Sequence, residues 1–292
     1  MDSPYVIILF YKFIEIENPE KLKKEQKRLC ENLRLKGRML IAKEGINATF
    51  EGKKEDVALY KQNLIQNPLF KDVVFKESEG TGSGFTKLKI KVRSEVVTLA
   101  AGTFDVPKET AQAITAGELE ALYAKNDDFV ILDLRNDFEV KAGYFEKTIN
   151  PELTHFRDLP KKLPSLRHLK DKKIITVCTG GIRCEKATCL MKREGFTNLY
   201  QLKDGIHTYM KEYPGKRFKG SLFVFDNRMV TPVVATDKRE IVGTCVFCNT
   251  PSEEFYNDDT VRPSAKMIVC PSCAPDYADR LRKCSPSFSD AL

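Results

Sequence analysis

The order of hydrophobic and polar positions in the first hundred residues predicts strands separated by helices. The apolar run at residues 5–13 is typical of a buried strand, and shorter strands are expected at residues 39–42 and 48–50. A further extended segment is predicted at residues 73–75. Residues 87–93 alternate strictly between basic and apolar side chains, which indicates a strand with one face in the core and the other in solvent.

Two helices are predicted between these strands. Asn18-Pro19-Glu20 is a helix-start signal before the leucine-spaced stretch at residues 22–35, and Gly37 is expected to end this helix. The second helix is predicted over residues 55–65. The resulting order, β-α-β-β-α-β, predicts a ferredoxin-like (acylphosphatase-like) sandwich of one sheet and two helices over residues 1–98.

A second domain is predicted after a connector. Glycine and proline break any regular pattern in residues 99–114, which are therefore expected to link two domains. A helix is expected to start at Thr115, and apolar strands at residues 129–133 and 174–177 alternate with helices. This alternation predicts a parallel α/β domain over residues 115–220, with its chemistry at the carboxyl ends of the strands.

The remaining residues, 221–292, are predicted to form a small cysteine-rich C-terminal extension. Short strands are expected at residues 221–225 and 230–234, and the tail at residues 285–292 is expected to be disordered. The whole chain is therefore predicted to be a multi-domain protein that combines α/β and α+β architecture.

Composition narrows the class of protein. With 292 residues, of which 42% are hydrophobic and 30% charged, the chain is expected to be globular and too long for a single core. It has neither a membrane-spanning apolar run nor a secretory signal at its start, so a soluble, cytoplasmic protein without a membrane partner is expected. The net charge of +7 is unevenly distributed and allows an anionic partner such as nucleic acid. The oligomeric state is left open.

The most informative segment is Cys178-Thr179-Gly180-Gly181-Ile182-Arg183-Cys184. A strand ends at Cys178, two glycines let the backbone N–H groups turn inward, and a helix begins near Cys184. Converging amides, the positive end of the helix and Arg183 form a cradle for an anion. A thiol there ionises more readily than a free one, so Cys178 is a candidate nucleophile, with an inert buried thiol as the alternative. Cys184 is a candidate resolving thiol, with helix packing as its alternative.

The sequence around this loop resembles a rhodanese domain. The resemblance rests on Asp133-x-Arg135-Asn136-x-x-Glu139 and on the loop at residues 178–183. Asp133 and Arg135 are expected to support the active site. Arginine follows the cysteine by five positions, whereas phosphatases that share this fold need one residue more to enclose a phosphate. The loop therefore favours sulfur chemistry. Rhodanese domains usually carry Gly-His and a Trp, but this chain has Gly143-Tyr144 and no Trp, which counts against simple thiosulfate sulfurtransferase activity.

The wider chain resembles the bacterial rhodanese-domain family of tRNA uridine hydroxylases. Three stretches carry the resemblance: residues 41–47, 178–187 and 219–228. It implies 5-hydroxylation of the wobble uridine in certain tRNAs, with tRNA as partner, molecular oxygen as co-substrate and the loop cysteine required. No flavin, nicotinamide or iron motif is visible, and the electron donor and the particular tRNAs are left open.

The chemical role of Cys178 also stays open at this point. The thiol can form an adduct with the uracil ring that activates C5, or it can carry an oxidised sulfur species. Two rival functions are a sulfurtransferase that carries a persulfide on Cys178 and a non-catalytic, zinc-containing RNA-binding protein.

A second group of cysteines forms two C-x-x-C pairs that are 21 residues apart. Four thiolates in this arrangement predict a structural zinc site, with redox-active pairs or unligated thiols as alternatives. The predicted ligands are Cys245, Cys248, Cys270 and Cys273.

Basic side chains provide candidate contacts to tRNA phosphates. The strongest candidates share one face of the last predicted strand of the first domain, and a solvated charged face is the alternative reading. They are Lys87, Lys89, Lys91 and Arg93. Residues 21–38 and 155–173 are further basic segments.

Overall fold

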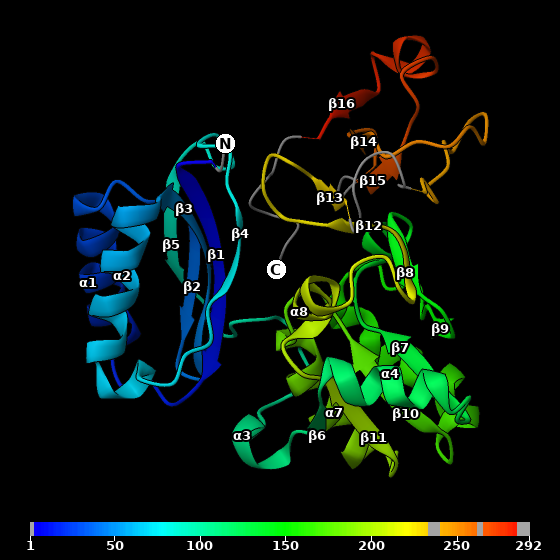
Figure 1. Cartoon of the computed structure of the whole chain (residues 1–292), viewed down its shortest axis with the longest axis horizontal. Helices are drawn as coiled ribbons and strands as arrows, with labels where there is room; N and C mark the ends of the chain where they lie inside the picture. The colour runs from blue at the N-terminus through cyan, green and yellow to red at the C-terminus, as the bar shows by residue number, and fades with distance from the viewer. Residues whose placement is uncertain (1–2, 233–239, 262–264, 285–292) are drawn as a thin grey trace. The chain divides into compact units, whose positions relative to one another are not determined.

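The computed structural model of the chain describes residues 3–232, 240–261 and 265–284. The tail at residues 285–292 and the end of the strand expected at 230–234 lie outside the described residues. The chain divides into two compact units (Figure 1). One unit contains the residues up to Ala100 together with residues 105–108, and the other contains residues 101–104 and the chain from Glu109 onward.

The first unit is a five-stranded sheet in the order β4-β1-β3-β2-β5. Its strands are β1 (Tyr5–Phe13), β2 (Lys36–Ala42), β3 (Gly45–Lys53), β4 (Lys76–Glu79) and β5 (Leu88–Val92). Its helices, α1 (Pro19–Asn32) and α2 (Lys54–Gln66), cover the same face of the sheet in Figure 1, and the 3₁₀ helix Pro68–Phe70 follows α2. Alternate residues of the strands, such as Ile8 and Phe10 of β1, form the buried core beneath the helices. The predicted ferredoxin-like sandwich is confirmed, and β5 extends it by pairing parallel to β2.

Two local predictions in this unit were wrong. The fourth strand lies at β4 rather than at residues 73–75, because the apolar Val73 and Phe75 pack against the core while the polar residues after them pair with β1. Gly37 does not end α1 but lies inside β2 with φ of +134°, where a Cβ atom would stand 2.2 Å from the carbonyl oxygen of Thr49. A close approach of two strands therefore explains this glycine.

The second unit contains a five-stranded parallel sheet in the order β6-β11-β10-β7-β9. Its strands are β6 (Gln112–Ile114), β7 (Phe129–Asp133), β9 (Thr148–Ile149), β10 (Lys173–Val177) and β11 (Leu199–Leu202). The helices of this part are α4 (Ala116–Ala124), α5 (Asp137–Val140), α6 (Leu159–Lys162), α7 (Ile182–Arg193) and α8 (Gly205–Glu212), with 3₁₀ helices at Phe156–Asp158 and Leu163–Leu169. The short helix α3 (Val106–Glu109) lies mostly within residues 105–108, which belong to the first unit.

The predicted α/β architecture is thus present, but the end of the expected connector belongs to the sheet. Residues 112–114 form β6, the edge strand next to β11. A strand of three residues is too short to show a periodic pattern, so sequence reasoning had no signal for it.

The C-terminal part contains two small antiparallel sheets. The first, in the order β13-β12-β8, joins β12 (Phe218–Phe223) to β8 (Gly143–Phe145) and β13 (Val230–Pro232). The second, in the order β15-β14-β16, is formed by β14 (Phe255–Asp258), β15 (Ala265–Ile268) and β16 (Leu281–Lys283), with a 3₁₀ helix at Ala274–Tyr277. The boundary expected between residues 220 and 221 falls inside β12. Among the described residues, no helix combines the length and the apolar character needed to cross a lipid bilayer.

Candidate active site and cysteine cluster

The loop that follows β10 encloses the sulfur of Cys178. Gly181 precedes the first residue of α7 with φ of +101°, and its N–H donates to the Cys178 Sγ over 3.1 Å. Helix α7 starts at Ile182, two residues earlier than expected. The first turn of α8 holds the loop from the other side, since the amides of Ile206 and His207 donate to the carbonyl oxygens of Cys178 and Thr179, both over 3.0 Å.

The surroundings of Cys178 stabilise a thiolate. Burial by itself raises the pKa of this thiol, but four other contributions outweigh it: a hydrogen bond from the Cys184 thiol, the positive charge of Arg183, and the backbone amides of Cys184 and Arg183. Together they lower the pKa of Cys178 to about 5. At neutral pH the Cys178 sulfur is therefore negatively charged and nucleophilic.

Cys184 lies beside this thiolate as a neutral thiol. It is the third residue of α7, it is fully buried, and its side chain hydrogen-bonds the Cys178 sulfur. Burial, this hydrogen bond and the Cys178 charge raise the pKa of Cys184 well above its usual value. Cys189 lies on the same helix but donates to the carbonyl oxygen of Glu185 over 3.1 Å, so it belongs to the helix packing.

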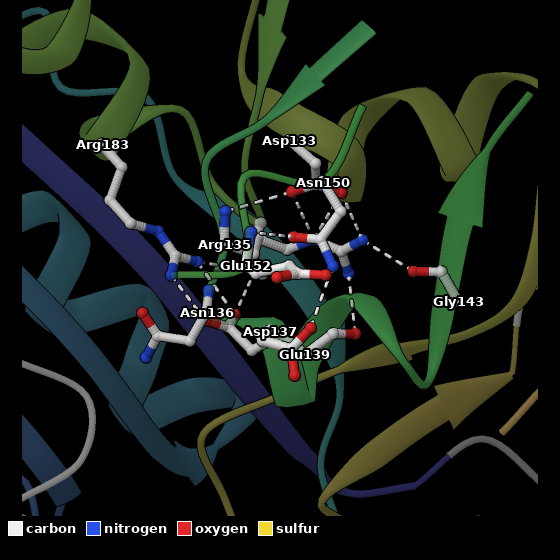
Figure 2. Close-up of polar contacts among 10 residues, drawn as sticks. Asp133, Arg135, Asn136, Asp137, Glu139, Gly143, Asn150, Glu152 and Arg183 are labelled. Atoms are coloured by element: carbon white, nitrogen blue, oxygen red, sulfur yellow. Dashed lines mark hydrogen bonds and ion pairs between the residues drawn. The ribbon is translucent and has the colours of Figure 1, made fainter. Parts of the chain in front are cut away.

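Arg183 is held by a carboxylate that sequence reasoning did not select. Its Nη1 lies 2.5 Å from Glu139 Oε1, and its Nη2 lies 2.9 Å from Glu139 Oε2 (Figure 2). Its Nη2 also reaches Thr179 Oγ1 at 3.3 Å. The guanidinium of Arg183 is thus paired with Glu139. The sequence predicted instead that it would contact an anion bound in the loop. Its charge and its backbone amide still act on Cys178.

Glu139 is completely buried on the short helix α5, and its position follows from a helix cap. Its Oε1 accepts the backbone N–H of Asn136 over 2.9 Å, as in a capping box. The spacing Asn136-x-x-Glu139 is the sequence signal that could have identified this residue.

Asp133 and Arg135 form a buried ion pair that supports α5. Both side chains are completely buried, and Arg135 Nη2 lies 2.6 Å from Asp133 Oδ2. The same guanidinium donates to the carbonyl oxygens of Gly143, over 2.6 Å, and of Glu139, over 3.3 Å (Figure 2). Arg135 therefore ties the end of β7 to α5 and to β8, and so fixes the helix that carries Glu139.

The four predicted metal ligands meet in one cluster. The sulfur atoms of Cys245, Cys248, Cys270 and Cys273 all lie within 4.8 Å of one another. Four thiolates around a zinc ion, each about 2.3 Å from the metal, would be separated by similar distances. Backbone amides of Phe247 and Cys248 also hydrogen-bond the Cys245 sulfur. This donor set fits a tetrahedral metal ion.

The basic residues of the first unit lie where the alternating pattern predicted. Lys89 and Lys91 belong to β5, and Lys87 and Arg93 flank it, while the alternate apolar residues of this strand pack against the core. In the parallel register with β2, Arg38 is the neighbour of Lys89 and extends the same face. Burial and the like charges of Lys87 and Lys91 lower the pKa of Lys89, as expected for closely spaced cations.

The parallel sheet and the cysteine loop define a rhodanese-domain protein. Family models match three successive parts of the chain: a UPF0176 acylphosphatase-like domain at residues 5–96, a rhodanese-like domain at 115–212 and a rhodanese C-terminal region at 219–287. A solved rhodanese-like domain protein from Staphylococcus aureus covers 34% of this chain and 90% of its own, with 26% identity and a TM-score of 0.29.

Curated relatives extend over nearly the whole chain. The tRNA uridine(34) hydroxylase of Onion yellows phytoplasma is 39% identical over 92% of this chain and 88% of its own length. The enzyme of the same name from Bacillus cytotoxicus is 40% identical over 97% of this chain and 87% of its own. The chain belongs to the tRNA uridine(34) hydroxylase family.

Proposed function

We propose that this protein hydroxylates C5 of the wobble uridine, position 34, in tRNA with molecular oxygen as co-substrate. The observation that carries the proposal is a loop with a stabilised thiolate, in a chain that matches curated hydroxylases along nearly its full length. The activity makes this chain an oxidoreductase that acts on tRNA. Because such a substrate is found in the bacterial cytoplasm, the proposal includes a cytoplasmic location.

Cys178 is the catalytic residue of this proposal. Its charge at neutral pH suits nucleophilic or redox chemistry at sulfur. Thr179, Gly180 and Gly181 form the turn that leads into α7, whose first residue is Ile182. This turn directs amides toward the sulfur, and Arg183 supplies positive charge. Asp133 and Arg135 act as positioning residues, since they fix the helix whose Glu139 orients Arg183.

The face of β5 is the proposed contact with the tRNA backbone. Lys87, Lys89, Lys91 and Arg93 form a closely spaced row of cations, in which burial and the like charges of Lys87 and Lys91 lower the pKa of Lys89. Arg38 of β2 adds a fifth cation to the surface. Phosphate contacts of this kind provide affinity without sequence preference. Selection of the uridine is then left to contacts near the loop.

Zinc is the metal that we propose for the cysteine cluster. Closed four-thiolate sites in proteins are usually structural zinc sites, and the four sulfurs are already close together. The ion would hold the two C-x-x-C turns together beside the small sheet β15-β14-β16, and its role would be stability of the C-terminal part rather than chemistry.

For the domain organisation, we retain the sequence boundaries as a proposal: a first domain at residues 1–98, a connector at 99–114, a rhodanese domain at 115–220 and an extension at 221–292. The family matches at residues 5–96 and 115–212 fall inside the first domain and the rhodanese domain, whereas the match at 219–287 begins two residues before the proposed extension.

The proposal is tested by mass spectrometry of tRNA nucleosides. Purified protein is incubated with unmodified tRNA in air and under argon, and 5-hydroxyuridine is quantified after digestion. We expect product only with oxygen and only with Cys178 intact. Transfer of labelled sulfur from thiosulfate to tRNA, without hydroxyuridine, would instead favour the sulfurtransferase, and RNA binding without either product would favour a non-catalytic protein.

A further inference from the structure

Two thiols lie together at the centre of the loop, and the proposed function assigns chemistry only to Cys178. The side chain of Cys184 hydrogen-bonds the Cys178 sulfur, and both residues are completely buried. The contact is built into the backbone, because Cys184 lies in the first turn of α7, where its own amide also donates to the carbonyl oxygen of Gly181 over 3.0 Å. Two adjacent thiols can be oxidised to a disulfide, and this oxidation releases two electrons.

We propose that Cys178 and Cys184 act together as the two-electron donor for uridine hydroxylation. The inference rests on the proposed function, because it supplies the reductant that this reaction requires. Insertion of one oxygen atom of O₂ into a C–H bond leaves the second oxygen atom to be reduced to water, which takes two electrons and two protons.

The atoms and electrons balance with these two sulfurs and one proton from solvent. The C5–H bond of uracil, the O–O bond and the Cys184 S–H bond break, while a C5–O bond, one S–S bond and new O–H bonds form. Uridine, O₂, the Cys184 thiol, the Cys178 thiolate and the solvent proton thus give 5-hydroxyuridine, one disulfide and water. Each sulfur is oxidised by one electron. External thiol then reduces the disulfide before the next turnover.

The environment of the pair suits this task. One sulfur is held as a thiolate by amides and Arg183, while the other is held as a neutral thiol. Oxidation of the Cys178 thiolate removes the negative charge that helps to raise the pKa of Cys184, so Cys184 can then lose its proton and attack the oxidised Cys178 sulfur to close the disulfide. Cys189 is a matched comparison, since it lies further along α7 and its thiol is engaged with a backbone carbonyl.

The test is a single turnover without added reductant. The full-length protein is reduced, freed of reductant under argon and mixed with unmodified tRNA. Air-saturated buffer then starts the reaction. We expect one disulfide, between Cys178 and Cys184, for each 5-hydroxyuridine formed, as measured by non-reducing peptide mapping and nucleoside mass spectrometry. The same protein without tRNA should keep both thiols over the same time.

Variants separate the dithiol from general damage to the loop. Cys184→Ser and Cys184→Ala should lose both product and disulfide in this assay, whereas Cys189→Ser should retain both. Stoichiometric product from the wild type with both loop thiols still reduced would overturn the dithiol inference and leave the proposed function intact. Disulfide formation at equal rates without tRNA would also overturn the inference. If the wild type gives neither product nor disulfide, the proposed function and the inference fail together.

Discussion

Replacing Arg183 by alanine should raise the pKa of Cys178 and destabilise the domain, for two separable reasons. The thiolate loses a nearby positive charge, and an opposite charge at close range typically changes a pKa by about 1 to 3. The midpoint of thiol ionisation should therefore move from about 5 to between about 6 and 8. Near pH 6 the thiolate fraction, and with it the alkylation rate, should fall by between about twofold and about a hundredfold.

The cost to stability has a different origin. Glu139 is completely buried, and without Arg183 its carboxylate loses the guanidinium that compensates its charge. Breaking one side of a buried ion pair typically costs about 3–5 kcal/mol. The double variant Arg183→Ala/Glu139→Gln removes the orphaned charge, and the introduced glutamine keeps an oxygen for the Asn136 amide. It should recover most of the lost free energy of unfolding without returning the Cys178 pKa to about 5.

The assay is iodoacetamide alkylation of Cys178 across pH, followed by peptide mass spectrometry, with urea unfolding of the same proteins. Arg193→Ala is the matched control, because Arg193 lies on the same helix and pairs with Glu109 at the surface. Its loss should cost less than about 1 kcal/mol and leave the alkylation midpoint in place. An unchanged midpoint in folded Arg183→Ala protein would refute the role of this charge in stabilising the thiolate.

Three further predictions concern the reaction, the metal and the RNA contact. Cys178→Ser should keep the fold and lose tRNA hydroxylation, while Cys189→Ser keeps both; full activity of the first variant would exclude a catalytic thiol. Purified protein should contain one zinc per chain by elemental analysis, and chelation should loosen the C-terminal part while the rhodanese domain stays folded; four freely titratable cluster thiols without metal would contradict this. Lys89→Ala/Lys91→Ala should weaken binding to all tRNAs and reduce the salt slope by up to about 0.9 per lost phosphate contact; an unchanged slope would assign this face to solvent.

Local sequence patterns predicted the helices and strands whose signals lie within a few neighbouring residues. The alternation at residues 87–93 identified β5 because every second side chain is apolar and enters the core. The capping residue Thr115 identified the start of α4 for a similar reason, since its side chain accepts the backbone N–H of Glu118. Alternation and capping depend only on residues within a few positions of each other, so both can be recognised in a single sequence.

What sequence reasoning missed depends on contacts between distant segments. Gly37 has the appearance of a helix terminator, but its conformation is required by the carbonyl of Thr49 on the next strand. Glu139 was visible within a motif, yet its role depends on Arg183, which lies 44 positions later. The partner of a charged side chain in a loop cannot be read from spacing alone, because the fold decides which segments meet.

The buried charges around the loop are better explained by positioning than by stability. Replacing a buried ion pair with apolar residues of similar size is often neutral or even stabilising, so Asp133 with Arg135, and Arg183 with Glu139, are not needed to hold a core together. Apolar residues cannot form the directional hydrogen bonds that fix the position of a neighbouring group. The guanidinium of Arg135 fixes the carbonyl of Glu139, the carboxylate of Glu139 fixes Arg183, and Arg183 contributes charge and an amide to Cys178. Apart from the charge of Arg183, each step uses the fixed geometry of a hydrogen bond. A change at Arg135 should therefore affect the Cys178 pKa through this chain of contacts, and the alkylation midpoint of an Arg135→Lys protein would measure it.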